Sequence, residues 1–401
     1  MNNTIKLAVA AALVAAASTA NAGIMIPAGD WTLDIGGVVN AYYTSTRVEA
    51  PGVASQTVSN ITTGLLPNYL TVSGKTREND LDVGFTISIQ PGAATATSGT
   101  LGSLNQRQAF LTFGDASWGS IKLGKDLGIY ASDAILNDMT LLGVGAGASG
   151  VGTTTLGRIG GGYIYADWKS QIAYTTPNFN GFSATVGVTQ SWNTQGNGGS
   201  AAFTDAGGAH AAVVATDTVT SLRGGSQSAY EGKASYAWTG DVAGKVWVSA
   251  ISQNLQISQS RDTNANAWDI GANVNVAGFG ATGYYGQGKG TGTIIQFSEG
   301  LDAAGNKRDS DDWYVQGTYT IPTVGTKLGA SYGESTLDGN TVDTYNNKVR
   351  KQWTVGAYHP LTKHLNLVAE YTDLQAEVDK KTAADTSATS KTVSLGAILF
   401  F

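Results

Sequence analysis

The sequence predicts an all-β protein, a 16-stranded antiparallel transmembrane β-barrel, and three observations lead to this fold class. The chain ends in an amphipathic strand on Phe401, it begins with an export signal, and its segments of alternating polarity are joined by connections that alternate between short and long. A transmembrane barrel has short turns on one rim and long loops on the other. A soluble β-sandwich has no reason to keep this alternation.

The C-terminal strand is amphipathic up to its last residue. Every second residue from Val393 to Phe401 is apolar. On the other face, Thr392, Ser394 and Gly396 are small or polar. A soluble protein rarely ends on such a strand, because an unpaired apolar edge aggregates. In a closed barrel the last strand pairs with the first, and the terminal ring lies at the membrane–water interface.

Residues 1–22 form a predicted secretory signal peptide. Lys6 supplies the positive charge, and the apolar run Leu7–Ala17 is too short to span a bilayer as a helix. Ala20-Asn21-Ala22 matches a cleavage pattern. An N-terminal anchor helix is the alternative, which the length of the run disfavours. We therefore expect a signal peptide at 1–22, which is removed on export, and one barrel domain at 23–401.

The composition fits a wall with one face in lipid and the other in water. Charged residues make up 13% of the chain, against about 25% in a soluble domain. The net charge of −6 comes without a basic run, so we expect no nucleic-acid partner. The chain has no Cys and only three scattered His, so we expect neither a disulfide, nor a metal site, nor a cofactor.

Sixteen segments have the length and the alternation of strands that cross a bilayer. Most are 9–13 residues long, close to the ~9–11 residues that a tilted strand needs. In one of them Trp313 and Val315 share an apolar face, whereas Tyr314 and Gln316 lie on a polar one. The segments are Trp31–Thr46, Asn68–Gly74, Asp80–Gln90, Leu104–Gly114, Gly119–Asp126, Trp168–Thr176, Gly181–Trp192, Ser228–Thr239, Gly244–Gln256, Asn266–Val276, Gly280–Lys289, Asp311–Ile321, Thr326–Glu334, Lys351–His359, His364–Glu377 and Lys391–Phe401.

The connections alternate in length along the chain. If seven turns and eight loops join 16 strands, both chain ends lie on the turn side. Short connections include Lys75–Asn79, Asp115–Trp118, Pro177–Asn180, Ala277–Phe279, Pro322–Gly325 and Pro360–Lys363. Long connections include Arg47–Pro67, Leu127–Asp167, Asn193–Gln227, Gly290–Ser310 and Val378–Ser390.

Four stretches carry a family resemblance. The most specific, Ser170–Phe182, is similar to the pattern Asn-Ser-(apolar)-x-Tyr-x-Ser-Pro-x-Phe-x-Gly-Phe, and the others are Arg107–Gly114, Gly119–Lys125 and Gly157–Gly161. On these stretches, and in plan over the whole mature chain, the sequence resembles the general porins of Gram-negative outer membranes. The resemblance implies a homotrimer of water-filled channels, through which ions and small hydrophilic solutes diffuse passively across the outer membrane.

The resemblance also implies partners and a site. The partners are outer-membrane lipid, lipopolysaccharide and the barrel-assembly machinery, which would read Phe401 as an assembly signal. The site is a constriction, formed where the long third loop Leu127–Asp167 folds into the lumen. Acidic residues on that loop would face basic residues on the wall and set a transverse field that orients solutes and biases ion traffic.

The predicted constriction contains basic residues matched to the wall, acidic residues of the loop, and a charged pair on the fifth segment. Leu142 stands where many enteric relatives carry a glutamate, so we expect fewer charges and leave the ion preference open. The set consists of Arg107, Arg158 and Lys169 as basic residues, Asp133 and Asp138 as loop acids, and Lys122 with Asp126.

Three other functions remain as alternatives. A barrel hydrolase needs a nucleophile beside a His base, but His210, His359 and His364 have no evident partner at the external rim, so we expect no enzyme. A substrate-specific channel would need a ladder of lumenal side chains, and Tyr314 with Tyr358 are too few to indicate one. A structural or adhesive barrel with a plugged lumen is the third.

Overall fold

The computed structural model describes residues 23–94, 104–147, 150–151, 153–191, 227–257, 262–302 and 304–401. The predicted signal peptide and His210 lie outside these residues. Within the described ranges, none of the helices has the length and apolar character needed to cross a membrane.

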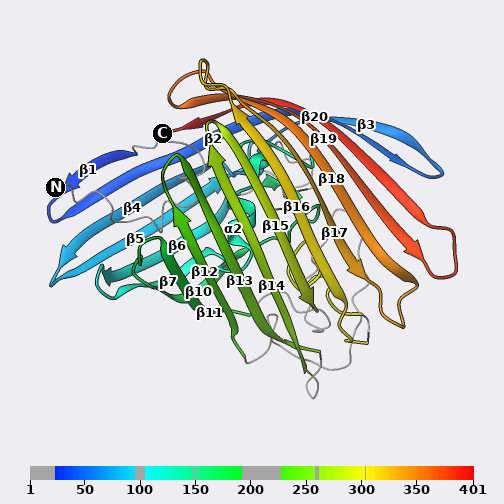
Figure 1. Cartoon of the computed structure of the whole chain (residues 1–401), viewed down its shortest axis with the longest axis horizontal. Helices are drawn as coiled ribbons and strands as arrows, with labels where there is room; N and C mark the ends of the chain where they lie inside the picture. Colours follow the sequence, from blue (N-terminus) through cyan, green and yellow to red (C-terminus); the bar gives the residue numbers. More distant parts are fainter. Residues whose placement is uncertain are drawn as a thin grey trace.

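Sixteen antiparallel strands form one closed sheet, which confirms the predicted fold class (Figure 1). Each pairs with its neighbours in chain order, and the last pairs with the first. Every predicted segment overlaps one of these strands. They are β2 (Trp31–Ala50), β4 (Tyr69–Glu78), β5 (Leu81–Pro91), β6 (Leu104–Asp115), β7 (Gly119–Leu127), β10 (Trp168–Thr175), β11 (Phe182–Thr189), β12 (Ala229–Trp238), β13 (Val242–Gln256), β14 (Asp262–Val276), β15 (Phe279–Lys289), β16 (Asp309–Thr320), β17 (Lys327–Asp338), β18 (Tyr345–Pro360), β19 (Leu365–Lys380) and β20 (Thr386–Phe400).

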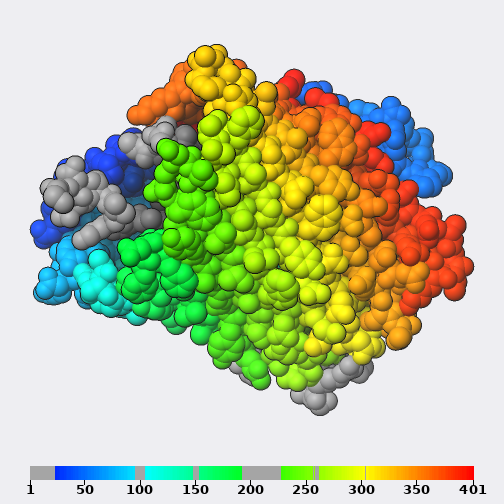
Figure 2. Space-filling view, in the orientation of Figure 1, coloured from blue at the N-terminus to red at the C-terminus, as the bar shows by residue number. Residues whose placement is uncertain are grey.

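The alternation of side chains separates an apolar outer face from a polar inner face. On β16, Val315 is 52% exposed on the outside, whereas Tyr314 is fully buried inside the barrel. On β20, Leu395 is 54% exposed and its neighbour Ser394 is buried. A row of such exposed apolar side chains is stable only against lipid, because water would make it an aggregation site. Figure 2 shows β12 to β20 side by side from outside as one continuous wall.

The barrel closes between β2 and β20, and Phe401 extends this seam. The paired residues run from Val38 opposite Phe400 to Glu49 opposite Thr389. One residue further, Phe401 N–H donates to the Gly37 carbonyl at 3.1 Å, and Gly37 N–H donates to the Phe401 carbonyl at 2.8 Å. A Cβ on Gly37 would lie 2.7 Å from the Phe401 ring. The lack of a side chain at residue 37 therefore allows the terminal ring to sit against the first strand.

Two further strands join the sheet where the sequence predicts none. β1 (Ile24–Ala28) pairs with the start of β2, and β3 (Val53–Thr62) pairs with its end. The connection Arg47–Pro67 was predicted as a loop, but this was wrong for β3, because its β-branched residues continue the hairpin beyond the barrel.

The turns and loops follow the predicted two-rim plan. Asn79 and Asp80 both have positive φ, as a two-residue hairpin turn between β4 and β5 requires. Strand β1, where the described residues begin, and the C-terminal residue both lie at the rim that carries these turns, on the left of Figure 1. The loop predicted at Val378–Ser390 is shorter in the structure, because β19 ends only at Lys380 and β20 already begins at Thr386.

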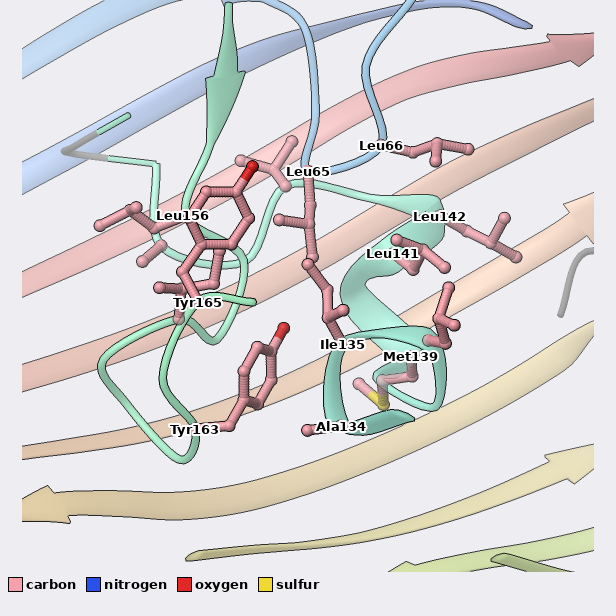
Figure 3. Packing of buried hydrophobic residues seen from close by; sticks show 14 of the residues in the cluster. Leu65, Leu66, Ala134, Ile135, Met139, Leu141, Leu142, Leu156, Tyr163 and Tyr165 are labelled. Atoms are coloured by element: carbon pink, nitrogen blue, oxygen red, sulfur yellow. The ribbon is translucent and has the colours of Figure 1, made fainter. Parts of the chain in front are cut away.

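The core lies inside the barrel, where the segment between β7 and β10 packs against the wall. This segment contains α2 (Ser132–Leu136), the 3-10 helix η1 (Met139–Leu142) and the short strands β8 (Gly150–Val151) and β9 (Thr154–Thr155). The apolar side chains of α2 and η1 meet Leu65 and Leu66 of the chain before β4 (Figure 3). The long third loop is therefore folded into the lumen.

We expect Gly37→Ala to destabilise the barrel by ~1–3 kcal/mol, the usual cost of overpacking. The added Cβ would lie 2.4 Å from the Tyr69 carbonyl oxygen, so the seam must shift. The matched control is Gly317→Ala on β16, where a Cβ meets nothing within 4 Å. Urea midpoints of the refolded proteins measure both effects, and equal midpoints would contradict the role assigned to the seam.

Candidate functional site

Residues 128–167, here called the folded-in segment, cross the lumen and bond to strands all around the wall. The Tyr314 hydroxyl on β16 donates to the Ala134 carbonyl at 2.9 Å, and the Tyr42 hydroxyl on β2 donates to the Leu142 carbonyl at 2.8 Å. Gln316 accepts from Met139 N–H at 2.7 Å and donates to the Asn137 carbonyl at 3.0 Å. The polar inner face of the barrel therefore satisfies the backbone of the segment.

Two carboxylates of the wall hold the segment by consecutive backbone N–H groups. Glu231 Oε2 on β12 accepts from Ile129 and Tyr130 at 2.8 and 2.9 Å. Glu370 Oε2 on β19 accepts from Val144 and Gly145 at 2.7 and 2.9 Å. Both carboxylates are buried, and such charge-assisted bonds are stronger than neutral ones. The two glutamates therefore fix the start and the middle of the segment on different strands of the wall.

The position of Glu370 requires a glycine on the segment. A Cβ on Gly143 would lie 2.1 Å from Glu370 Oε1, so any side chain there would displace the carboxylate. The same oxygen accepts a hydrogen bond from the Tyr358 hydroxyl at 2.6 Å. Gly143 therefore permits the close approach of backbone and wall.

Asp133 on α2 pairs with two lysines of the wall. Its carboxylate contacts Lys245 on β13 and lies 3.2 Å from Lys233 on β12. Burial raises the pKa of Asp133, but the two lysines outweigh this effect and hold the pKa below its usual range. A carboxyl with a lowered pKa stabilises the fold above its unfolded pKa, and this contribution is lost as the pH falls through the folded value. The attachment of α2 should therefore persist in mild acid.

Asp138 caps the start of η1 and therefore has a structural role. It accepts from Thr140 N–H at 3.0 Å, from the Thr140 hydroxyl at 2.6 Å and from the Tyr163 hydroxyl at 2.8 Å. Burial and the nearby Asp138 charge raise the pKa of Tyr163 well above its ordinary value, so Tyr163 stays a hydroxyl donor. The Asp138 side chain is only 4% exposed, so it does not face an open lumen.

Arg158 does not belong to the wall, which corrects the sequence-based placement. It lies on the folded-in segment, where it is fully buried and points at β17 and β18. Its guanidinium donates to the Gln352 carbonyl at 2.9 Å and to the Ser331 hydroxyl. Burial lowers the pKa of Arg158, which Asp138 partly offsets. Removing this side chain would loosen the segment rather than change the charge at an aperture.

Arg107 and Lys169 lie on the wall, as expected, but both are buried. Arg107 on β6 lies over the Trp168 ring at 5.6 Å, with Nη2 3.5 Å from the Thr154 hydroxyl. Lys169 on β10 contacts Glu231 at 2.5 Å and Gln296 at 2.6 Å. Lys169 therefore connects the wall to a second inward-folded stretch.

This second stretch, residues 291–301 between β15 and β16, also folds into the barrel and packs on the folded-in segment. Tyr165 N–H donates to the Ile294 carbonyl at 3.0 Å, and Gln296 Nε2 donates to the Tyr165 carbonyl at 3.0 Å. Phe297 is fully buried in a cluster with Tyr130. Apart from the length of the predicted loop, no sequence pattern indicated this arrangement.

Lys122 and Asp126 form an ion pair on the inner face of β7, with side chains 18% and 11% exposed. The lysine and acid side chains near α2 differ more in exposure, because Lys245 and Lys233 are 33% and 26% exposed, whereas Asp133 is 4% exposed. In both groups the lysine is more exposed than its acid.

Sequence reasoning missed most of the residues that hold the segment. It gave no role to Glu370, Glu231, Lys233 or Lys245. A signal was available, because these charges occupy the inner positions of strands whose outer positions are apolar. Charged residues on the inner face of a barrel lie in the lumen or beneath a loop that covers it.

Comparison with known proteins relates the chain to membrane channels. Residues 8–379 match the family described as Gram-negative porin. The structure is similar to the anion-selective porin from Comamonas acidovorans, with a TM-score of 0.62 and 18% identity over 92% of this chain and 100% of that chain. The outer membrane channel DcaP of Acinetobacter baumannii gives 0.66 and 17% over 95% and 100%. Salmonella typhi OmpF in complex with daunomycin gives 0.55 and 16% over 94% and 100%. No curated protein matches the chain.

We expect Glu370→Ala to destabilise the protein by ~1–3 kcal/mol, because two buried N–H groups lose their acceptor. The loosened segment should also raise the current noise of single channels. Glu377→Ala on the same strand is the control, since its partly exposed pair with Lys351 should cost at most ~1 kcal/mol. Equal unfolding midpoints and equal noise in the two variants would show that Glu370 does not hold the segment.

Proposed function

The chain belongs to the Gram-negative porin family, and on that premise we propose that its channel prefers anions. It is an outer-membrane β-barrel channel for the passive diffusion of small hydrophilic solutes. The inner face of such a barrel is polar and the outer face meets lipid, as the alternation along its strands requires.

The observation that supports anion preference is the difference in exposure between bases and acids. Lys245 and Lys233 of the wall keep 33% and 26% of their side chains exposed, while Asp133 on the segment keeps 4%. Lys122 is likewise more exposed than Asp126. A permeating ion interacts most strongly with the charges that are closest to it and least screened. We therefore expect the lysines to dominate the local electrostatic potential. One structurally similar protein is an anion-selective porin by name, which is consistent with this proposal.

An enzyme and a substrate-specific channel are less well supported. The described His359 and His364 lie at the turn rim, away from the folded-in segment, and Thr326 lies 2.8 Å from His359 Nδ1. Tyr314 and Tyr358, the inward tyrosines that could have lined a solute track, are buried and bond to Ala134 and Glu370. We propose that the protein is a diffusion channel without catalytic activity.

The assembly is a second part of the proposal. We infer a homotrimer in outer-membrane lipid and lipopolysaccharide, inserted by the barrel-assembly machinery through its C-terminal strand. The apolar outer face of β2, β4 and β20, with Val39, Leu70 and Leu395 exposed, offers a surface for a second copy. The ring of Phe401 is 38% exposed at the seam, where an assembly factor could contact it.

Reversal potentials in a salt gradient across planar bilayers test the selectivity. Wild type should favour anions, and Lys233→Gln and Lys245→Gln should each lower the anion-to-cation permeability ratio by roughly fourfold, because one charge at ~10 Å in water changes the energy of an anion and of a cation by ~0.4 kcal/mol each, in opposite directions. Lys351→Gln, on the outer face and paired with Glu377, is the control. The shift should shrink at 1 M salt, where the Debye length is ~3 Å. A cation-selective wild type, or equal shifts in all three variants, would refute the proposal.

Gels in detergent test the trimer. The unheated protein should migrate as a large species, and the boiled protein should migrate as a single chain. A monomer in mild detergent would exclude the trimer.

Deletion of Phe401 tests its role as an assembly signal. The deletion should strongly reduce the amount of protein in the outer membrane but should change the stability of the refolded protein only slightly. Normal outer-membrane levels without Phe401 would exclude its role as a signal.

A further inference from the structure

The outer wall of the barrel carries a groove across β10 to β15, with β12 to β14 at the front of Figure 1. Its volume is 1150 Å³, above the ~300–1,000 Å³ of a typical small-molecule pocket. Gly232 on β12 lies directly opposite Ala250 on β13, and these two small residues form the floor. Around them Tyr230, Val186 and Trp268 are 63%, 60% and 42% exposed. The groove is therefore a furrow between projecting apolar side chains.

The groove begins at the loop rim with polar side chains. Lys289 is the last residue of β15 and lies opposite Asp309, the first residue of β16. Their side chains are 58% and 55% exposed and form an ion pair of 3.2 Å. Asn266 on β14 and then Ser252 on β13 continue the same row across the strands. A charged and hydrogen-bonding end therefore lies where the barrel meets the head groups of the outer leaflet.

The same row becomes apolar as it continues toward the turn rim. Ser252 lies opposite Tyr230 on β12, which lies opposite Val188 on β11. Val188 in turn lies opposite Ile172 on β10, three residues before the turn-side end of that strand. Strands are ~4.8 Å apart and tilted by ~35–45°, so the six steps from Asp309 to Ile172 cover ~29 Å and descend ~17–20 Å. This depth exceeds half of a ~30 Å hydrocarbon core.

The position of the groove on the barrel decides what covers it. Its centre on β12 and β13 lies across the barrel from β2 and β20, whose outer face we assign to the trimer. The groove therefore stays in contact with lipid when three copies associate. An exposed ion pair is weak, and a lysine ammonium has three donors, so Lys289 can contact a phosphate beside Asp309.

We propose that the groove binds one molecule of lipopolysaccharide from the outer leaflet, which rests on the lipid partner named in the proposed function. An acyl chain lies over Gly232 and Ala250, and a phosphate of the head group contacts Lys289. Asn266 and Ser252 supply hydrogen bonds between these two points. The chain and the phosphate match the apolar floor and the basic end of one continuous groove.

Native mass spectrometry of the delipidated protein in detergent tests the site, with purified lipopolysaccharide as the probe. Wild type should hold one molecule per chain. Ala250→Phe fills the floor and should weaken binding roughly tenfold, the cost of leaving about two methylene groups unburied. Gly232→Leu fills the same place from the next strand and serves if Ala250→Phe does not fold. Gly283→Phe, on the outer face of β15 where a Cβ meets nothing within 4 Å, is the matched control and should bind as wild type does.

Removal of the phosphates tests the head-group contact. Lys289→Gln should weaken binding about threefold, the effect of one exposed ion pair. It should not change the binding of lipopolysaccharide whose phosphates have been removed. Lys351→Gln, on the outer face of β18 and likewise paired with an acid, is the control and should bind as wild type does.

Three outcomes would overturn the site. They are equal affinities in all variants, equal binding of phosphatidylethanolamine, and an Ala250→Phe protein that changes its oligomeric mass but not its affinity for lipid. The last outcome would assign the groove to a second copy of the chain. Channel conductance and reversal potentials are measured separately, so failure of this site leaves the diffusion function standing.

Discussion

The structure depends on one constraint: a chain that leaves the wall of a closed barrel and enters its lumen must find partners there for its backbone. Backbone N–H and C=O groups left unpaired in a buried place cost about as much as a lost hydrogen bond each. Here the wall supplies those partners, with Glu231 and Glu370 each accepting two consecutive N–H groups. The hydrogen-bonding groups on the inner face of the barrel therefore determine the conformation of the folded-in segment.

This constraint also decides where charge is presented. Carboxylates accept hydrogen bonds but donate none, so Glu231 and Glu370 of the wall suit the backbone N–H groups of the segment and are buried against it. Lys245 by contrast keeps 33% of its long side chain exposed, against 4% for its partner Asp133 on the segment. Under the proposed anion preference, a chain with a net charge of −6 presents a positive surface to permeating ions. Overall charge is a poor guide to the selectivity of such a channel.

The fold could be predicted because its signals are local. Alternation of period two, turn residues such as Asn79 and Asp80, and the length of each segment act over a few residues, and all 16 predicted strands overlap observed ones. The constriction could not be predicted in the same way, because it depends on which strand a loop residue meets across the lumen. Arg158 and Gln352 lie 194 positions apart, and no local pattern connects them.

Matching a charged residue to a family position therefore does not establish its role. Asp138 and Arg158 correspond to positions where the resemblance places an eyelet, yet both are buried and bond within the segment or to the wall behind it. Lys233 and Lys245, which match no quoted motif, are the more exposed partners of Asp133. In the proposed channel, therefore, the residues that set selectivity follow from which inner positions beside the segment hold a partly exposed base, and not from the fold alone.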